Sequence, residues 1–109
     1  MVNGFENWFQ QQQKIHPDAN RKILQFIFRF QQSSPDMIRV FTTGYCYYFA
    51  VLLKDAFDGN IYLNPEKDHI IWSNDRKVFY DITGVCNGQI KKSSIVEVPK
   101  EKLKSFRKV

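Results

Sequence analysis

Cysteines and metal-binding spacings are scarce in this sequence. Two cysteines, Cys46 and Cys86, occur in 109 residues, and two thiols are too few for a disulfide framework. The sequence contains neither a Cys-x-x-Cys nor a His-x-x-x-His spacing. A zinc site built from Cys46, His69 and Cys86 is therefore disfavoured, and we expect no metal and no other cofactor.

Long apolar runs are also missing. No stretch approaches the ~20 consecutive apolar residues that cross a bilayer. Residues 1–7 have no basic start and no apolar segment follows them, which is unlike an export signal. These absences predict a soluble, cytoplasmic protein whose two thiols stay reduced and which has no contact with a membrane.

The excess of positive charge is confined to one end of the chain. The net charge of +5 arises from residues 91–109, because basic and acidic residues balance in residues 1–90. Nucleic-acid-binding domains more often spread basic residues over a folded face and place aromatic residues among them. The pattern is more typical of a solvated terminal helix, although the basic tail 91–109 leaves nucleic-acid binding open.

Apolar residues are numerous enough for one packed domain, since 43% of the chain is hydrophobic and 16% aromatic. Residues 5–14 and 18–32 have apolar residues at helical spacing, and 37–40 is expected to form a brief helical turn. Short apolar runs bounded by turn residues predict strands at 60–64, 69–73, 78–83 and 94–98. The expected fold class is α+β, in a single domain that spans residues 1–109. Its parts are a helical region (5–40), a core (42–98) and a basic C-terminal tail (99–109).

Cys46 lies at the start of the most apolar helix that the sequence predicts. Thr42, Thr43 and Gly44 form an expected capped loop, and the run that follows has no helix breaker until Gly59. A thiol in the first helical turn experiences the positive end of the helix dipole and unpaired amide donors, which favour the thiolate. Cysteine is also among the most buried residue types, so a plain core role is the alternative.

His69 and Asp81 follow Cys46 on two predicted strands. A base that activates the thiol, and a carboxylate that orients the base, are the groups that cysteine nucleophiles require. The order Cys46, His69, Asp81 on a helix and two strands resembles the core of papain-like cysteine peptidases and of the transglutaminase-like and NlpC/P60-like hydrolases. The resemblance covers residues 42–84, and it implies a papain-like core in which a central helix packs on a small antiparallel sheet. It also implies that these three residues form a catalytic triad.

A catalytic site of this kind also needs donors for the oxyanion. The backbone amide of Cys46 is the first expected donor. Papain-like enzymes often have a glutamine upstream of the nucleophile, but the residue seven positions before Cys46 is Arg39. Tyr45, Thr43 and Trp72 are the residues that we consider as substitutes.

A catalytic triad requires that the hairpin formed by the predicted strands 69–73 and 78–83 place His69 and Asp81 on the same face of the sheet. A regular two-residue turn at 75–76 would place His69 and Asp81 on opposite faces of the sheet. A three-residue loop at 74–76, or a bulge, would place them directly opposite each other on one face. We therefore predict the second arrangement, with both side chains directed to the start of the Cys46 helix.

Two functions from different classes fit these observations. The first is a small cysteine hydrolase or acyl-transfer enzyme that acts on an amide, peptide, isopeptide or thioester bond of a protein or peptide. The second is a non-catalytic binding module on a papain-like fold, such as a phage-type inhibitor of a host defence complex. Rapid acylation of Cys46 that is lost in a His69→Ala variant distinguishes the enzyme from the binding module.

Overall fold

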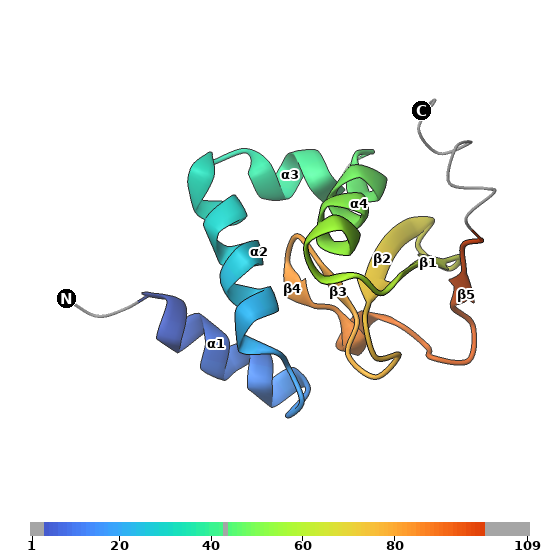
Figure 1. The fold of residues 1–109 in the computed structure, drawn as a ribbon, viewed down its shortest axis with the longest axis horizontal. Helices are drawn as coiled ribbons and strands as arrows, with labels where there is room; N and C mark the ends of the chain where they lie inside the picture. Colours follow the sequence, from blue (N-terminus) through green and yellow to red (C-terminus); the bar gives the residue numbers. More distant parts are fainter. Residues whose placement is uncertain (1–3, 43, 100–109) are drawn as a thin grey trace.

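The fold is α+β, with four α-helices followed by a five-stranded antiparallel sheet (Figure 1). This computed structural model describes residues 4–42 and 44–99, and the counts of elements refer to these residues. The terminal helix expected in the basic tail 99–109 lies outside them from residue 100 onward. No helix in the described ranges is both long enough and apolar enough to cross a membrane.

The helices begin and end close to where the apolar pattern predicts. They are α1 (Gly4–Ile15), α2 (Arg21–Ser33), α3 (Met37–Thr42) and α4 (Cys46–Phe57). Helix α2 starts at Arg21 rather than Asp18, because Asn20 is its N-cap and accepts a hydrogen bond from the amide of Ile23. Helix α4 buries Tyr47, Phe49, Ala50 and Leu53, as a central helix should.

The sheet has the order β4-β3-β2-β1-β5. Its strands are β1 (Asn60–Asn64), β2 (His69–Ser73), β3 (Tyr80–Asp81), β4 (Gly84–Val85) and β5 (Val96–Glu97). Strands β1 and β2 form the long central hairpin, and α4 packs on β1, β2 and β3. Helices α1 and α2 lie beside β4, at the end of the sheet away from β5 (Figure 1).

The strand expected at 78–83 is shorter than predicted and is followed by another strand. Only Tyr80 and Asp81 pair as β3, after which the chain turns back through Gly84 into β4. Asp81 causes the turn, since its Oδ1 accepts from the amide of Thr83 at 2.8 Å. Gly84 has a φ of 109°, which a side chain would strain. The segment between the strands predicted at 78–83 and 94–98 therefore begins with β4.

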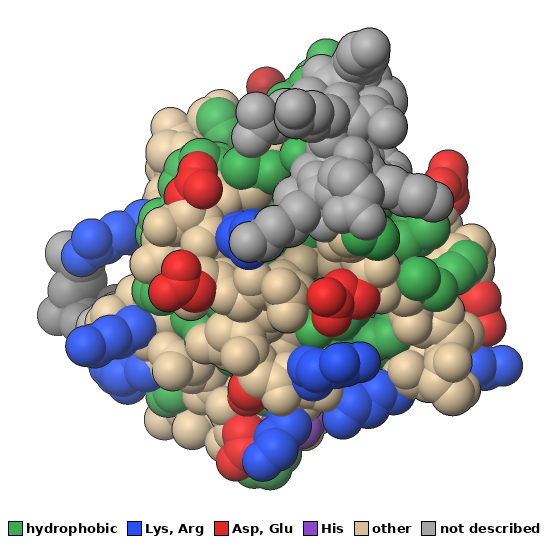
Figure 2. All heavy atoms as spheres, turned by 45° about the vertical axis from the view of Figure 1, so that its right-hand side comes forward, with side chains coloured by type: hydrophobic (Ala, Val, Ile, Leu, Met, Phe, Trp, Pro, Cys, Tyr) green, Lys and Arg blue, Asp and Glu red, His purple; other side chains and the backbone are tan. Residues whose placement is uncertain are grey.

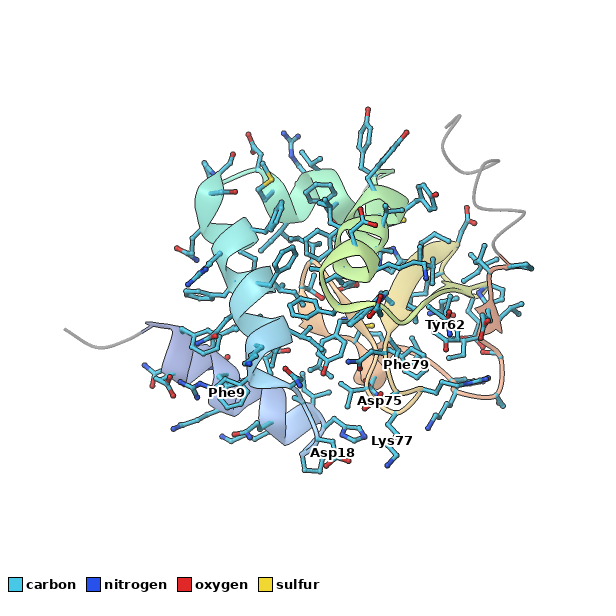
Figure 3. All side chains as sticks on the ribbon, viewed as in Figure 1. Phe9, Asp18, Tyr62, Asp75, Lys77 and Phe79 are labelled. Carbon is cyan, nitrogen blue, oxygen red and sulfur yellow. The ribbon has the colours of Figure 1, made fainter. Side chains whose placement is uncertain are left out.

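Both faces of the sheet are buried. The helical face shares one large core with the helices, in which Ile61 and Leu63 of β1 lie with Ile70 and Trp72 of β2. The opposite face carries a smaller apolar cluster made of Tyr62, Ile71, Phe79 and Cys86, covered by Ile90 and Ile95. Tyr62 and Phe79 meet edge to face at 5.2 Å, and Figure 3 labels both.

Helix α1 is attached to the edge of the sheet by a buried polar contact. The side chain of Gln12 is 6% exposed, and its Oε1 accepts a hydrogen bond from the amide of Val85 on β4 at 2.6 Å. An ion pair between Glu6 and Arg21 joins the outer surfaces of α1 and α2. The Gln12 contact satisfies an edge-strand amide that would otherwise need water or another chain.

Candidate active site

Cys46 is the first residue of α4, and its thiol lies against the beginning of β2. The amide of Ile70 donates to Cys46 Sγ at 3.4 Å. The N-cap position is held by Tyr45, whose side chain makes no capping hydrogen bond. Thr42, one of the two expected capping residues, instead ends α3 and donates its hydroxyl to the carbonyl of Ile38. In this first turn the backbone amide of Tyr47 is among the groups that favour the thiolate of Cys46.

Asp81 holds the imidazole of His69 in place. The distance from His69 Nε2 to Asp81 Oδ2 is 2.8 Å, and both side chains are largely removed from solvent. The second oxygen of Asp81 accepts from the backbone and hydroxyl of Thr83. With Nε2 engaged by the carboxylate, Nδ1 is the ring nitrogen left for the thiol of Cys46.

The pairing of β2 with β3 brings these side chains to the same side of the sheet. Trp72 lies opposite Tyr80, which gives the predicted register in which His69 and Asp81 share a face. The two are not directly opposite each other, however, because the connection 74–79 is longer than the predicted three-residue loop. The carboxylate reaches the imidazole diagonally across the end of the sheet.

The thiol and the imidazole shift each other's protonation. Burial raises the pKa of Cys46, but the hydrogen bond from His69, the Ile70 amide, the charge of the imidazolium and the Tyr47 amide together lower the pKa below its ordinary value. The pKa of His69 is raised from 6.5 to about 9, chiefly by its hydrogen bond to Asp81 and then by the one to Cys46. Near neutral pH this coupling favours a thiolate–imidazolium pair.

The sulfur is accessible from two adjoining cavities. The first has a volume of about 410 Å³ and contains the His69 and Asp81 side chains. Its other lining residues are mostly polar: Thr42, Lys67, Asp68, Thr83 and Gln89. The second cavity has a volume of about 250 Å³ and a mostly apolar wall made by Tyr47, Tyr48, Leu63 and Ile70. Gly44, Cys46 and Asp68 border both cavities, so Cys46 lies where they meet.

Comparison with known proteins identifies one family. The family model described as "Phage YunG-like protein" matches residues 21–107. The chain belongs to the phage YunG-like family. The matched range contains Cys46, His69 and Asp81, and it begins at the start of α2, so α1 precedes it. Comparisons with curated proteins and with solved structures gave no match.

The three residues considered as further oxyanion donors have different locations in this family member. Trp72 is fully buried in the core, and its indole nitrogen donates to the carbonyl of Asp58 at 2.7 Å, so this N–H is not directed at Cys46. Tyr45 is 53% exposed at the N-cap of α4, with its ring against that of Tyr48. Thr43 lies outside the described residues.

Gln89 is the side-chain amide that sequence reasoning missed. It belongs to a short 3₁₀ helix, Asn87–Gln89, that follows β4, and it lines the first cavity together with Cys46 and His69. No periodicity or motif marks this position, because Gln89 is an exposed residue far along the chain from Cys46. Only the return of the chain past β3 and β4 brings it to the site.

Cys86 does not take part in this arrangement. It is 2% exposed in the apolar cluster with Tyr62, Ile71 and Phe79, and burial, followed by the charge of Asp81, raises its pKa well above the ordinary value. Among the described residues, no group of three or more His, Cys, Asp or Glu side chains has the arrangement of a metal site. The two thiols therefore have opposite environments, one electropositive and accessible and the other apolar and closed.

The surface of the described domain carries both signs of charge. Figure 2 shows acidic and basic side chains interspersed on one face. Two ion pairs join residues that are distant in the chain, Arg76 with Glu97 at 3.9 Å and Lys91 with Glu66 at 3.8 Å. The loop that contains Asp75 and Lys77 likewise has both signs (Figure 3). The remaining basic residues of the tail, from position 100 onward, lie outside the described residues.

Proposed function

We propose that this YunG-like protein is a small cysteine hydrolase or acyl-transfer enzyme that acts on an amide, peptide, isopeptide or thioester bond. The observation that carries the proposal is the ordered contact from Asp81 to His69 to Cys46 at an open cavity. A buried core cysteine needs none of these partners. A nucleophilic cysteine needs a base, a group that orients the base, and room for a carbonyl carbon beside its sulfur.

The proposed reaction has two steps. The Cys46 thiolate attacks the carbonyl carbon, an S–C bond forms, and the bond to the leaving group breaks as His69 gives its proton to that group. Water then attacks the thioester while His69 takes a proton from it. The S–C bond breaks, the carboxylic acid leaves, and the thiolate–imidazolium pair is restored. An amine in place of water would give acyl transfer.

The first amides of α4 and the Gln89 side chain are the proposed oxyanion donors. The backbone N–H groups at the start of a helix have no acceptor within the helix, and their dipoles favour negative charge there. Gln89 adds a neutral amide on the same cavity. The charge of Lys67, which also lines this cavity, favours an oxyanion as well.

We also propose that α4 and the sheet form a papain-like core. It is supported by the placement of the thiol at the N-terminus of α4, which packs on the sheet, and of the imidazole and carboxylate on β2 and β3. The proposal extends to the partner, which would be a protein or peptide that carries the scissile bond.

Acylation of Cys46 by p-nitrophenyl acetate, followed by mass spectrometry of the intact chain, tests the proposed function. We expect one acetyl group on Cys46, rapid release of p-nitrophenol, and a loss of at least about 100-fold in the acylation rate in His69→Ala. His16→Ala is the matched control, since His16 lies in a loop and its Nδ1 accepts a hydrogen bond from the local amide of Asp18.

The proposal would be contradicted if p-nitrophenyl acetate acylated Cys46 no faster than a free thiol and if His69→Ala did not change the acylation rate. That result would favour the alternative of a binding module in which the three residues only stabilise the fold. A pull-down with the unmodified protein and with Cys46→Ser would then show the same partners in both samples.

A further inference from the structure

The two cavities that meet at Cys46 differ in chemical character. The first is lined by hydroxyl, amide, ammonium and carboxylate groups, whereas the second is lined mainly by aromatic and aliphatic side chains. A substrate whose carbonyl carbon lies at the sulfur must place one substituent toward each side. The acyl part and the leaving group of the substrate must therefore bind in different cavities. The next question is which cavity binds which part.

The position of His69 decides which cavity binds the leaving group. The imidazole lines the first cavity and not the second. The group that departs from the carbonyl carbon must receive its proton from this ring, so it must lie on the same side of the sulfur as the ring. The water that completes the reaction must also approach the imidazole, and it enters the space that the leaving group has vacated.

We propose that the acyl part of the substrate binds in the apolar cavity formed by Tyr47, Tyr48, Leu63 and Ile70, and that a polar leaving group binds beside His69. This inference depends on the proposed function and specifies its substrate class: an apolar acyl group, aliphatic or aromatic, joined to a polar amine or thiol. Burial of the acyl group against Leu63 and Ile70 removes apolar surface from water.

The charges at the junction of the cavities agree with this orientation. The carboxylate of Asp68 borders both cavities, and Lys67 borders only the first. A polar leaving group finds hydrogen-bonding partners of both kinds there, whereas an apolar group in that position would take water away from the ammonium of Lys67 and the amide of Gln89.

Rates of Cys46 acylation by p-nitrophenyl acetate and p-nitrophenyl hexanoate test the orientation, since the leaving group is constant. The hexanoyl ester should acylate Cys46 about tenfold faster or more, because its additional methylenes become buried. Leu63→Asn, which keeps the size of the side chain but makes the wall polar, should reduce this ratio by at least half. Lys67→Ala, on the other cavity, should slow the reaction with both esters by the same factor and leave the ratio unchanged.

Leu52→Asn is the matched control for folding, because Leu52 is half-buried on α4 like Leu63 on β1 but lines neither cavity. Reaction of Cys46 with iodoacetamide shows whether each variant keeps the site intact. If Leu63→Asn does not fold, Tyr48→Ser removes another part of the same wall and should reduce the ratio in the same way.

Equal rates for the two esters in the unmodified protein would overturn the orientation while the proposed function stands. A ratio that falls in Lys67→Ala but not in the Leu63 and Tyr48 variants would overturn it as well, because the acyl chain would then occupy the polar cavity. Failure of both esters to acylate Cys46 would overturn the proposed function, and the orientation with it.

Discussion

Replacement of Asp81 by asparagine tests whether the carboxylate controls the protonation of His69. The substitution keeps the size of the side chain and an oxygen acceptor but removes the negative charge. The pKa of His69 is raised from 6.5 to about 9, and the largest contribution is the hydrogen bond to Asp81. A difference between 6.5 and about 9 corresponds to about 3 kcal/mol of preferential stabilisation of the protonated ring.

We expect the pKa of His69 to fall by more than about one unit in Asp81→Asn, toward the ordinary value. The pKa of Cys46 should rise at the same time, because a neutral imidazole no longer favours the thiolate. Alkylation of Cys46 by iodoacetamide at neutral pH should therefore be slower by about tenfold or more.

NMR titration of the histidine rings is the direct assay. The chain contains only two histidines, so His16 gives an internal reference signal. A raised pKa means that His69 contributes stability that is fully present below pH 6.5 and is lost as the pH rises through about 9. The lowered pKa of Cys46 has the opposite effect on the free energy of unfolding, since its contribution to stability increases with pH. The two effects overlap in an unfolding measurement, so the titration of the ring is measured directly.

The matched control is Asp55→Asn, which removes the same charge from an exposed position of α4. It should leave both the titration of His69 and the alkylation rate of Cys46 unchanged. A ring that titrates near 6.5 in the unmodified protein, or equally in Asp81→Asn, would refute the reasoning.

Three further predictions concern single positions. Iodoacetamide should label Cys46 at least about 100-fold faster than Cys86, because Cys86 is buried with a raised pKa, and equal labelling by peptide mass spectrometry would contradict this. Gln89→Ala should lower the acylation rate of Cys46 by about 10- to 100-fold without changing its alkylation, and an unchanged acylation rate would exclude the amide as an oxyanion donor. Trp72→Phe should destabilise the fold by about 1–2 kcal/mol in urea titrations, because the carbonyl of Asp58 loses its indole donor, while Cys46 alkylation stays the same.

The strands around the site were predictable where apolar residues decide them. The observed bounds of β1 and β2, 60–64 and 69–73, agree with the sequence prediction. Both strands are buried on nearly every side chain, and short runs of isoleucine, tyrosine and tryptophan between turn residues indicate such strands clearly. The α+β class and the central helix at Cys46 are confirmed for the same reason.

The elements that depend on individual polar contacts were not predictable. The predicted strand at 78–83 is confirmed only at Tyr80 and Asp81, and it ends there because the side chain of Asp81 accepts from the amide of Thr83 and turns the chain. An apolar pattern cannot reveal that contact. The same limitation applies to Gln89, which reaches the cavity only through the path of the backbone after β4. The spacing of apolar residues therefore predicts strands and helices, but it does not predict which polar side chains contact one another.

The contact between Gln12 and Val85 has a consequence for how the chain can be shortened. The family match begins at residue 21, so a fragment designed on that boundary would lack α1. In such a fragment the β4 amide that now bonds Gln12 at 2.6 Å would face solvent beside an uncovered apolar surface. An unpaired strand edge of this kind is a template for pairing with a second chain. We therefore expect material without the first helix to form dimers or aggregates rather than a smaller monomer.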